Sequence, residues 1–139
     1  MAEAETETPT KALPPVSPES LEYWEGCRDG KLLLQRCTDC GHVQFYPRLL
    51  CSACAGERLE WQQAEGRGVV KSFTIIRRAV SAAYEPDAPY VVALIELAEG
   101  PTMMSNVVGC EPESVAIGMA VQLDFEAISE AISLPIFRP

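Results

Sequence analysis

The chain has 139 residues, enough for one ordinary domain or two small ones, and its 47% hydrophobic and 22% charged content is typical of soluble proteins. Its formal net charge of -9 disfavours binding to phosphate backbones. No run approaches the roughly 18 apolar residues of a membrane span, so a cytoplasmic protein is expected.

The chain begins with residues 1–16, an acidic, proline-rich segment without apolar periodicity, which predicts a disordered tail. A short helix is expected within residues 17–30, because Ser17 can cap its start and Gly30 can end it. The helix has one apolar stripe, formed by Leu21, Trp24 and Cys27. This stripe could pack on the same chain or dock on another protein.

Four cysteines in two CxxC pairs lie within residues 31–62 and are the pattern that specifies chemistry. They are Cys37, Cys40, Cys51 and Cys54. A two-residue gap lets two thiolates reach one ion from one turn, and the residues between the pairs can form a returning hairpin. The spacing predicts a zinc ribbon with one structural ion, for which iron is the alternative. Four protein ligands leave no open coordination position, so we expect no catalytic residue there.

The residue after each pair predicts how its turn is built. Gly41 follows the first pair, where positive φ lets backbone amides face the thiolates. The second pair has Ala55 there and Gly56 one position later, so a shifted turn is expected.

Two disulfides, a redox CxxC and cysteines that merely pack are the competing interpretations of the cysteine pairs. Disulfides lack support, because the N-terminus has neither the basic start nor the apolar stretch of a signal peptide, and a redox CxxC usually occurs once. The lone Cys27 and Cys110 are expected to be small buried hydrophobic residues. His42, the single histidine, could compete for the metal but is expected to be a polar residue of the ribbon.

Residues 66–139 contain five short β-branched or apolar segments separated by glycine and proline turns. The predicted strands span residues 68–77, 90–96, 102–108, 120–127 and 132–137. The gap before the fourth strand is long enough for one helical turn, which fits a partly open OB-fold barrel. The chain is therefore predicted to be mainly β, with a helix and a ribbon before the barrel.

The run LLLQRCTDCGHVQFYPRLLCSAC, continuing through GRGVVKSFT to IGMAVQLDF, resembles a family of acyl-CoA-associated proteins. Its members combine a short N-terminal helix, a rubredoxin-like zinc ribbon and an OB-fold, and the resemblance covers about residues 19–139. The family commonly has an aromatic-Pro-Pro-Arg segment between the cysteine pairs. Here this segment is Phe45, Tyr46, Pro47 and Arg48, with one proline replaced by tyrosine.

The resemblance implies a non-catalytic accessory subunit in a hetero-oligomer. Such proteins sit beside thiolase-like condensing or retro-aldol enzymes, or beside hydratases, and act as a bridge or substrate channel for acyl-CoA thioesters. The partner is expected to dock on exposed apolar surface of the helix, the ribbon or a barrel edge.

An acyl-CoA contact would need cations for the phosphates and an apolar groove for the acyl chain. In the first barrel strand, Lys71, Phe73, Ile75 and Arg77 are expected to share one face by the period of two, and Arg78 begins the next loop. The two arginines could equally pair with an acidic partner or with carboxylates of this chain.

Two other classes of function compete with this one. An enzyme acting alone would need an activated nucleophile, but the sole histidine is remote in sequence from any candidate serine, and no spaced carboxylate pair stands out. A single-stranded nucleic-acid-binding module is the main alternative, because ribbons and OB-folds also serve that role. The 11 basic residues against 20 acidic ones, with 7% aromatic residues, argue against it.

Overall fold

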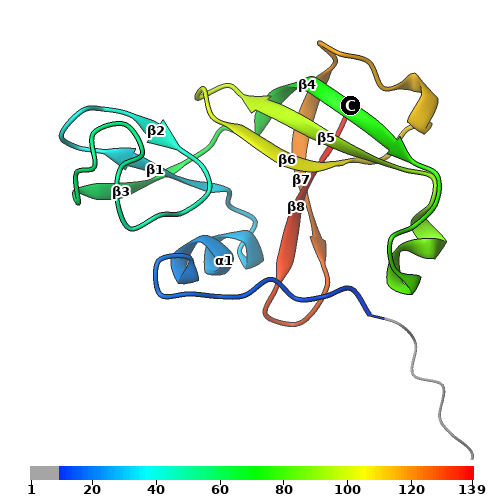
Figure 1. Cartoon of the computed structure of the whole chain (residues 1–139), viewed down its shortest axis with the longest axis horizontal. Helices are drawn as coiled ribbons and strands as arrows, with labels where there is room; N and C mark the ends of the chain where they lie inside the picture. Colours follow the sequence, from blue (N-terminus) through cyan, green and yellow to red (C-terminus); the bar gives the residue numbers. More distant parts are fainter. Residues whose placement is uncertain (1–9) are drawn as a thin grey trace, which may run out of the picture.

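The computed structural model describes residues 10–139, and residues 1–9 of the predicted tail lie outside them. A helix and a small sheet precede a barrel (Figure 1). The elements are α1 (Leu21–Arg28), β1 (Leu33–Cys37), β2 (Val43–Gln44), β3 (Leu59–Gln63), β4 (Arg67–Ile76), η1 (Ala82–Asp87), β5 (Tyr90–Leu97), β6 (Thr102–Val107), η2 (Pro112–Ser114), β7 (Ala120–Ala127) and β8 (Ser133–Arg138).

Helix α1 starts later than predicted, and it buries Trp24 and Cys27 of the predicted stripe but not Leu21. It begins at Leu21, and the hydroxyl oxygens of Ser17 and Ser20 lie 2.9 Å apart in the turn before it. Gly30 ends the helical segment with a φ of +80°, as predicted. Tyr23 is fully buried whereas Leu21 is 47% exposed, so the stripe expected from helical spacing is rotated toward Tyr23.

The ribbon is a three-stranded antiparallel sheet in the order β2-β1-β3. Strand β1 enters the first cysteine pair, and the short β2 returns from it along Gln35 and Arg36. Strand β3 pairs with all of β1, from Leu33 opposite Gln63 to Cys37 opposite Leu59. This third strand was absent from the prediction, which left the segment after the second pair unassigned.

The barrel contains the five predicted strands in the order β4-β5-β6-β8-β7, which is the strand order of an OB-fold. The expectation of a partly open barrel is wrong, because β4 also pairs with β7 and closes the sheet. One parallel pair, Val107 opposite Phe137, joins β6 to β8. The short helix η2 occupies the gap before the fourth barrel strand, as expected.

One hydrophobic core extends through the helix, the ribbon and the barrel. Tyr23 of α1 and Leu34 of β1 belong to the same buried cluster as Ile95 and Phe137 of the barrel. The ribbon is therefore anchored on the barrel through side chains, and helix α1 packs between them (Figure 1). In the part of the chain that the structure describes, no helix is both long and apolar enough to span a bilayer.

Candidate metal centre

The four predicted cysteine ligands converge on one point. Their Sγ atoms all lie within 4.8 Å of one another, and the closest pairs, Cys37 with Cys54 and Cys40 with Cys51, are 3.6 Å apart. Four sulfurs bound tetrahedrally at about 2.3 Å from one ion would be about 3.8 Å apart, whereas a disulfide needs about 2.05 Å. The predicted ligands thus form a site for a structural metal ion, and the disulfide alternative does not fit.

Both turns after the cysteine pairs have the same geometry. Gly41 and Ala55 take φ values of +78° and +61°, and their N–H groups donate to the carbonyl oxygens of Cys37 and Cys51. The expected shift to Gly56 is wrong, because Ala55 itself adopts the left-handed conformation. A Cβ at Gly56 would lie 3.2 Å from Cys54 Sγ and 2.9 Å from a carboxylate oxygen of the mobile Asp39 side chain, so glycine relieves crowding beside a metal ligand.

Backbone amides favour the thiolate form of a ligand. The N–H group of Cys54 lowers the pKa of Cys51 most strongly, and that of Ala53, 3.4 Å from the same sulfur, contributes in the same direction. These hydrogen bonds outweigh burial, and the pKa of Cys51 falls to about 7. A thiol that ionises near neutral pH is suited to metal binding.

The remaining cysteines and the histidine lie outside the four-thiol cluster. Cys27 is fully buried, and burial raises its pKa to about 11, while Cys110 is half-buried against the core. His42 Nε2 lies 3.1 Å from the hydroxyl oxygen of Ser52, so this contact links the two cysteine turns. His42 was expected to lie far from any candidate serine along the chain, but in the folded protein it lies beside Ser52. The pair is exposed and, within residues 10–139, no carboxylate contacts the imidazole, so the orienting group of a catalytic triad is missing.

A buried pair of glutamines, which the sequence interpretation missed, fixes the loop between the cysteine pairs. Gln35 Oε1 accepts hydrogen bonds from the Arg48 N–H at 2.8 Å and from Gln44 Nε2 at 2.9 Å, and Gln35 Nε2 donates to the Arg48 carbonyl. Gln44 in turn accepts from the Ser52 N–H at 2.8 Å. This network therefore positions the backbone on either side of Cys51. The available signal was a glutamine next to apolar residues on either side of the first cysteine pair.

Replacing Gln35 with leucine should weaken the ribbon while leaving all four thiols in place. The change leaves the Arg48 N–H and carbonyl, whose hydrogen bonds to Gln35 are partly buried, without these partners, at a cost of about 1–3 kcal/mol. Urea denaturation of the metal-loaded protein measures the loss, and metal transfer to a chelator should become about tenfold faster. The exposed Gln63 of β3 gives the matched control, because its change to leucine should cost less than about 0.5 kcal/mol. Equal stability of both variants would contradict this role.

An aromatic cluster joins α1 to the loop between the cysteine pairs. The Tyr23 ring packs edge-on against Trp24, Phe45 and Tyr46, with centroid distances of 4.8, 5.6 and 5.4 Å. Trp24 Nε1 donates a hydrogen bond to the Tyr46 hydroxyl at 3.1 Å. The tyrosine that replaces a family proline thus adds a polar contact to the helix. A groove of about 290 Å³ runs from this cluster to Met104 of β6.

The predicted acyl-CoA contact residues do not form one face. A β-bulge between Val70 and Ser72 interrupts the period of two, so Lys71 is exposed while Phe73 packs against the core. Arg77 follows the end of β4 and forms an ion pair with Glu113 at 3.1 Å. Arg78 is exposed in the next loop.

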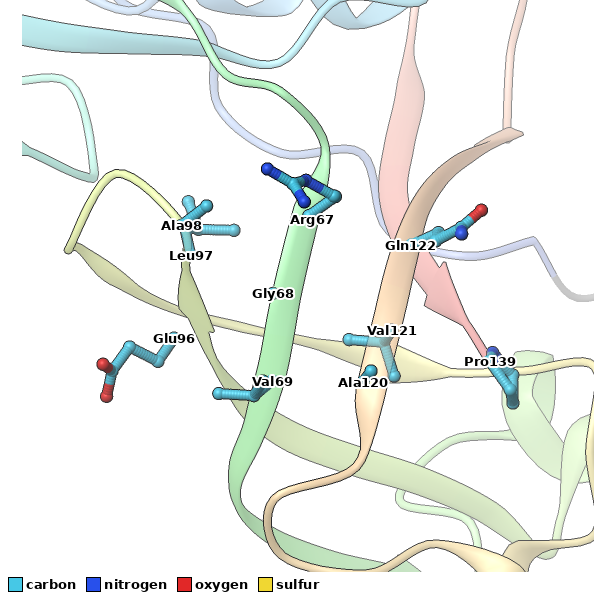
Figure 2. A pocket seen from close by; sticks show the side chains of 10 residues that line it. All are labelled: Arg67, Gly68, Val69, Glu96, Leu97, Ala98, Ala120, Val121, Gln122 and Pro139. Carbon is cyan, nitrogen blue, oxygen red and sulfur yellow. The ribbon is translucent and has the colours of Figure 1, made fainter.

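A cavity of about 510 Å³ lies on another part of the barrel, across β4, β5 and β7 (Figure 2). Gly68 lies on β4 between Arg67 and Val69, and a Cβ there would come within 2.6 Å of Ile95 Cγ2. The charged residues that line the cavity are Glu96 and Arg67, and Arg67 forms an ion pair with Glu65. The cavity contains none of the predicted contact residues, and one paired arginine is not a cluster of cations for phosphates.

A four-cysteine metal ribbon followed by a five-stranded OB-fold barrel defines the class of protein. Two family models match consecutive parts of the chain: "ChsH2, rubredoxin-like zinc ribbon domain" over residues 24–60 and "ChsH2, C-terminal OB-fold domain" over residues 61–126. The chain belongs to this ChsH2 family.

Relatives whose names assign them different roles are similar to this chain in sequence. The chain is 35% identical over 96 residues to a "DUF35 domain-containing scaffold protein" of Methanothermobacter thermautotrophicus, covering 68% of this chain and 71% of that protein. It is 34% identical over 138 residues to a "Probable enoyl-CoA hydratase alpha subunit" of Thermomonospora curvata, covering 97% of this chain. The chain spans only 43% of the length of that hydratase subunit.

A solved structure agrees along nearly its whole length. A chain of the "Ltp2-ChsH2(DUF35) aldolase" superposes with a TM-score of 0.83 at 33% sequence identity, covering 91% of this chain and 98% of that one. The agreement extends over helix, ribbon and barrel together. The arrangement of the three parts is therefore shared within the family.

Proposed function

We propose that this protein is a non-catalytic accessory subunit that binds a thiolase-like, retro-aldol or hydratase enzyme and helps to hold or channel its acyl-CoA substrate. The observation that carries the proposal is the structural match to a chain of the "Ltp2-ChsH2(DUF35) aldolase". The match covers 98% of that chain. The names of the hydratase alpha subunit and of the scaffold protein are consistent with the same role.

The chemistry of the described residues supports an accessory role. The four clustered thiols can saturate one ion, and a saturated tetrahedral site supplies neither a bound water nor a substrate position. Tetrahedral four-thiolate sites with this spacing are typical of zinc, which we propose as the resident ion. Elemental analysis should give one zinc per chain, and the reducing cytoplasm would keep these thiols free for it.

The charge distribution argues against the nucleic-acid alternative. Seven of the eleven basic residues lie within 4 Å of a carboxylate oxygen: Lys11, Arg28, Arg36, Arg58, Arg67, Arg77 and Arg138. A single-strand groove needs clustered free cations interleaved with aromatic rings. The paired arginines and the net charge of -9 favour contact with protein instead.

The proposal includes an acyl-CoA contact at the first barrel strand and the loop that follows it. Phe73 lies beside Leu94 and Met104 at a small apolar hollow of about 170 Å³, while Arg78 and Lys71 are exposed. Arg77 contacts Glu113, so it would have to exchange partners to reach a phosphate. Arg78 and Lys71 are therefore the cations of this set that are free to contact the nucleotide end of an acyl-CoA.

Co-expression with a thiolase-like, retro-aldol or hydratase polypeptide tests the proposal. The two chains should elute as one complex, and thioester turnover should require both. Within that complex, Arg78→Ala should raise KM for the acyl-CoA about threefold to tenfold at unchanged kcat, because it removes a binding contact. The exposed Arg58 of the ribbon is the matched control. Turnover by the isolated chain would refute the accessory role, and an unchanged KM would refute only the Arg78 contact.

A further inference from the structure

The segment before α1 places a lysine side chain in a pocket on the barrel. The Lys11 ammonium lies 2.9 Å from Asp87 Oδ2 and 2.9 Å from Glu126 Oε1. It also lies over the Tyr84 ring, 4.9 Å from the centroid. Figure 1 shows this blue segment crossing the β7–β8 hairpin toward the green helical turn after β4. One ammonium thus contacts three groups from two separate parts of the barrel chain.

The pocket exists because the barrel brings distant elements together. Asp87 ends η1, and Glu126 lies near the end of β7. Tyr84 and Tyr90 form one wall, with ring centroids 5.7 Å apart, and Val108 and Ile136 add apolar lining for an alkyl chain. A space of about 250 Å³ lies among these residues.

The burial of Lys11 separates this contact from the ordinary surface ion pairs of the protein. Its side chain is 16% exposed, whereas the basic partners of the other ion pairs among residues 10–139 are 48–80% exposed. Burial alone would lower the pKa of Lys11, but hydrogen bonds to Glu126 and Asp87 outweigh it and raise the pKa above its ordinary value. The ammonium is therefore held in its charged form within a partly desolvated site.

The composition of the pocket defines the chemical class of its ligand. Two carboxylates accept hydrogen bonds from a compact cation, an aromatic face stabilises it, and apolar side chains contact an alkyl stem. With Lys11 counted, the three charged groups still sum to -1, so the site favours a cation over any anion. A primary ammonium on a flexible alkyl chain can contact the carboxylates, the aromatic ring and the apolar side chains at the same time.

We propose that Tyr84, Asp87, Tyr90 and Glu126 form a recognition pocket for an alkylammonium group, and that Lys11 is its intramolecular ligand, which a lysine-bearing peptide of another chain can replace. While Lys11 is bound, residues 10–20 are fastened across the barrel and hold η1 against β7. When the segment leaves, the pocket opens to a lysine from elsewhere. This inference does not depend on the identity of the enzyme partner.

Chemical rescue of a Lys11→Ala variant tests the proposal in the full-length, metal-loaded protein. Heteronuclear NMR of the labelled protein should show that the variant loses order at residues 10–16 and 82–87. The amide resonances of the barrel core should stay unchanged. Titration with n-butylammonium should shift the Tyr84 and Tyr90 rings and restore order at η1, saturating with a dissociation constant on the order of 10 mM. Wild type should bind at least tenfold more weakly, because Lys11 competes. Lys31→Ala is the control, and it should behave as wild type.

The outcomes separate a built pocket from a chance contact. A neutral analogue, n-butanol, should fail to rescue, and Lys11→Ala combined with Glu126→Gln should lose the response to the amine. If Lys11→Ala disturbs the core, Lys11→Met keeps the aliphatic stem and carries the same titration. Equal amine-induced shifts in wild type and variant, or unchanged η1 resonances on removal of Lys11, would overturn the proposal.

A peptide experiment tests replacement in trans. A synthetic peptide spanning residues 8–16 should bind Lys11→Ala and produce the same ring shifts, whereas the peptide with an acetylated lysine should not, because acetylation removes the charge. Binding of both peptides alike, or of neither, would contradict recognition of the lysine ammonium as the basis of the contact.

Discussion

Replacing Cys51 with serine is expected to release the metal and unfold the ribbon. Structural zinc contributes about 10–16 kcal/mol of apparent binding free energy in small metal domains, comparable to or larger than the total stability of a typical protein. Cys51 is buried, lies 3.6 Å from Cys40, and accepts backbone hydrogen bonds, so a serine cannot replace its role as a thiolate. Metal content per chain and the dispersion of amide resonances from residues 33–63 measure the effect.

Cys110 provides the matched control for this experiment. It is half-buried and lies outside the four-thiol cluster, so Cys110→Ser should keep one metal ion per chain and a folded ribbon. The metal-free serine variant should also fail to co-purify with the enzyme partner, if the ribbon contributes to docking. A Cys51→Ser protein that retained one equivalent of metal and native ribbon resonances would contradict the four-thiolate assignment.

Replacing Tyr23 with alanine should have the second largest effect, a loss of about 3–5 kcal/mol of unfolding free energy. The ring is 1% exposed and packs against Trp24, Phe45 and Tyr46, so its removal leaves a cavity where the helix meets the loop of the ribbon. The expected fall in melting temperature is about 10–15 °C for a chain of this size. Thermal denaturation of the metal-loaded protein gives the value directly.

Leu21 lies on the same helix and gives the control for Tyr23. Its side chain is 47% exposed, so Leu21→Ala should change the stability by less than about 1 kcal/mol. Tyr23→Phe keeps the ring and should retain most of the stability. A small effect of Tyr23→Ala, comparable with that of Leu21→Ala, would show that α1 does not depend on the aromatic cluster.

The metal ligands and the barrel strands could be predicted from sequence because their signals are local. Two CxxC pairs constrain their own turns, and alternating β-branched residues between glycine and proline turns mark each strand. The strand predicted over residues 120–127 coincides with β7. Such patterns depend on neighbours along the chain and not on the rest of the fold.

The parts that were missed depend on contacts between distant residues. Leu21 fits helical spacing as well as Tyr23 does, and only the position of the ribbon decides which one is buried. The bulge at Lys71 inserts one residue without changing the local composition, so the period of two gave the wrong face for Lys71. The contact of Lys11 with Glu126 joins residues 115 positions apart. Patterns of residue spacing describe only near neighbours in the sequence, so they could not predict this contact.

The closure of the barrel limits how another protein can attach to it. An open sheet has a border strand with free N–H and C=O groups, onto which a second chain can add a strand of its own. The barrel is closed, but β4 pairs with β7 only over Arg67–Val69, and β6 pairs with β8 only at Val107. Closure therefore leaves only the stretches of β4 and β6 outside these pairs for strand addition. The ribbon has borders along its whole length, where β2 has two residues and β3 has five. A partner can extend the ribbon sheet along β3, whereas the closed part of the barrel has to be recognised through side chains.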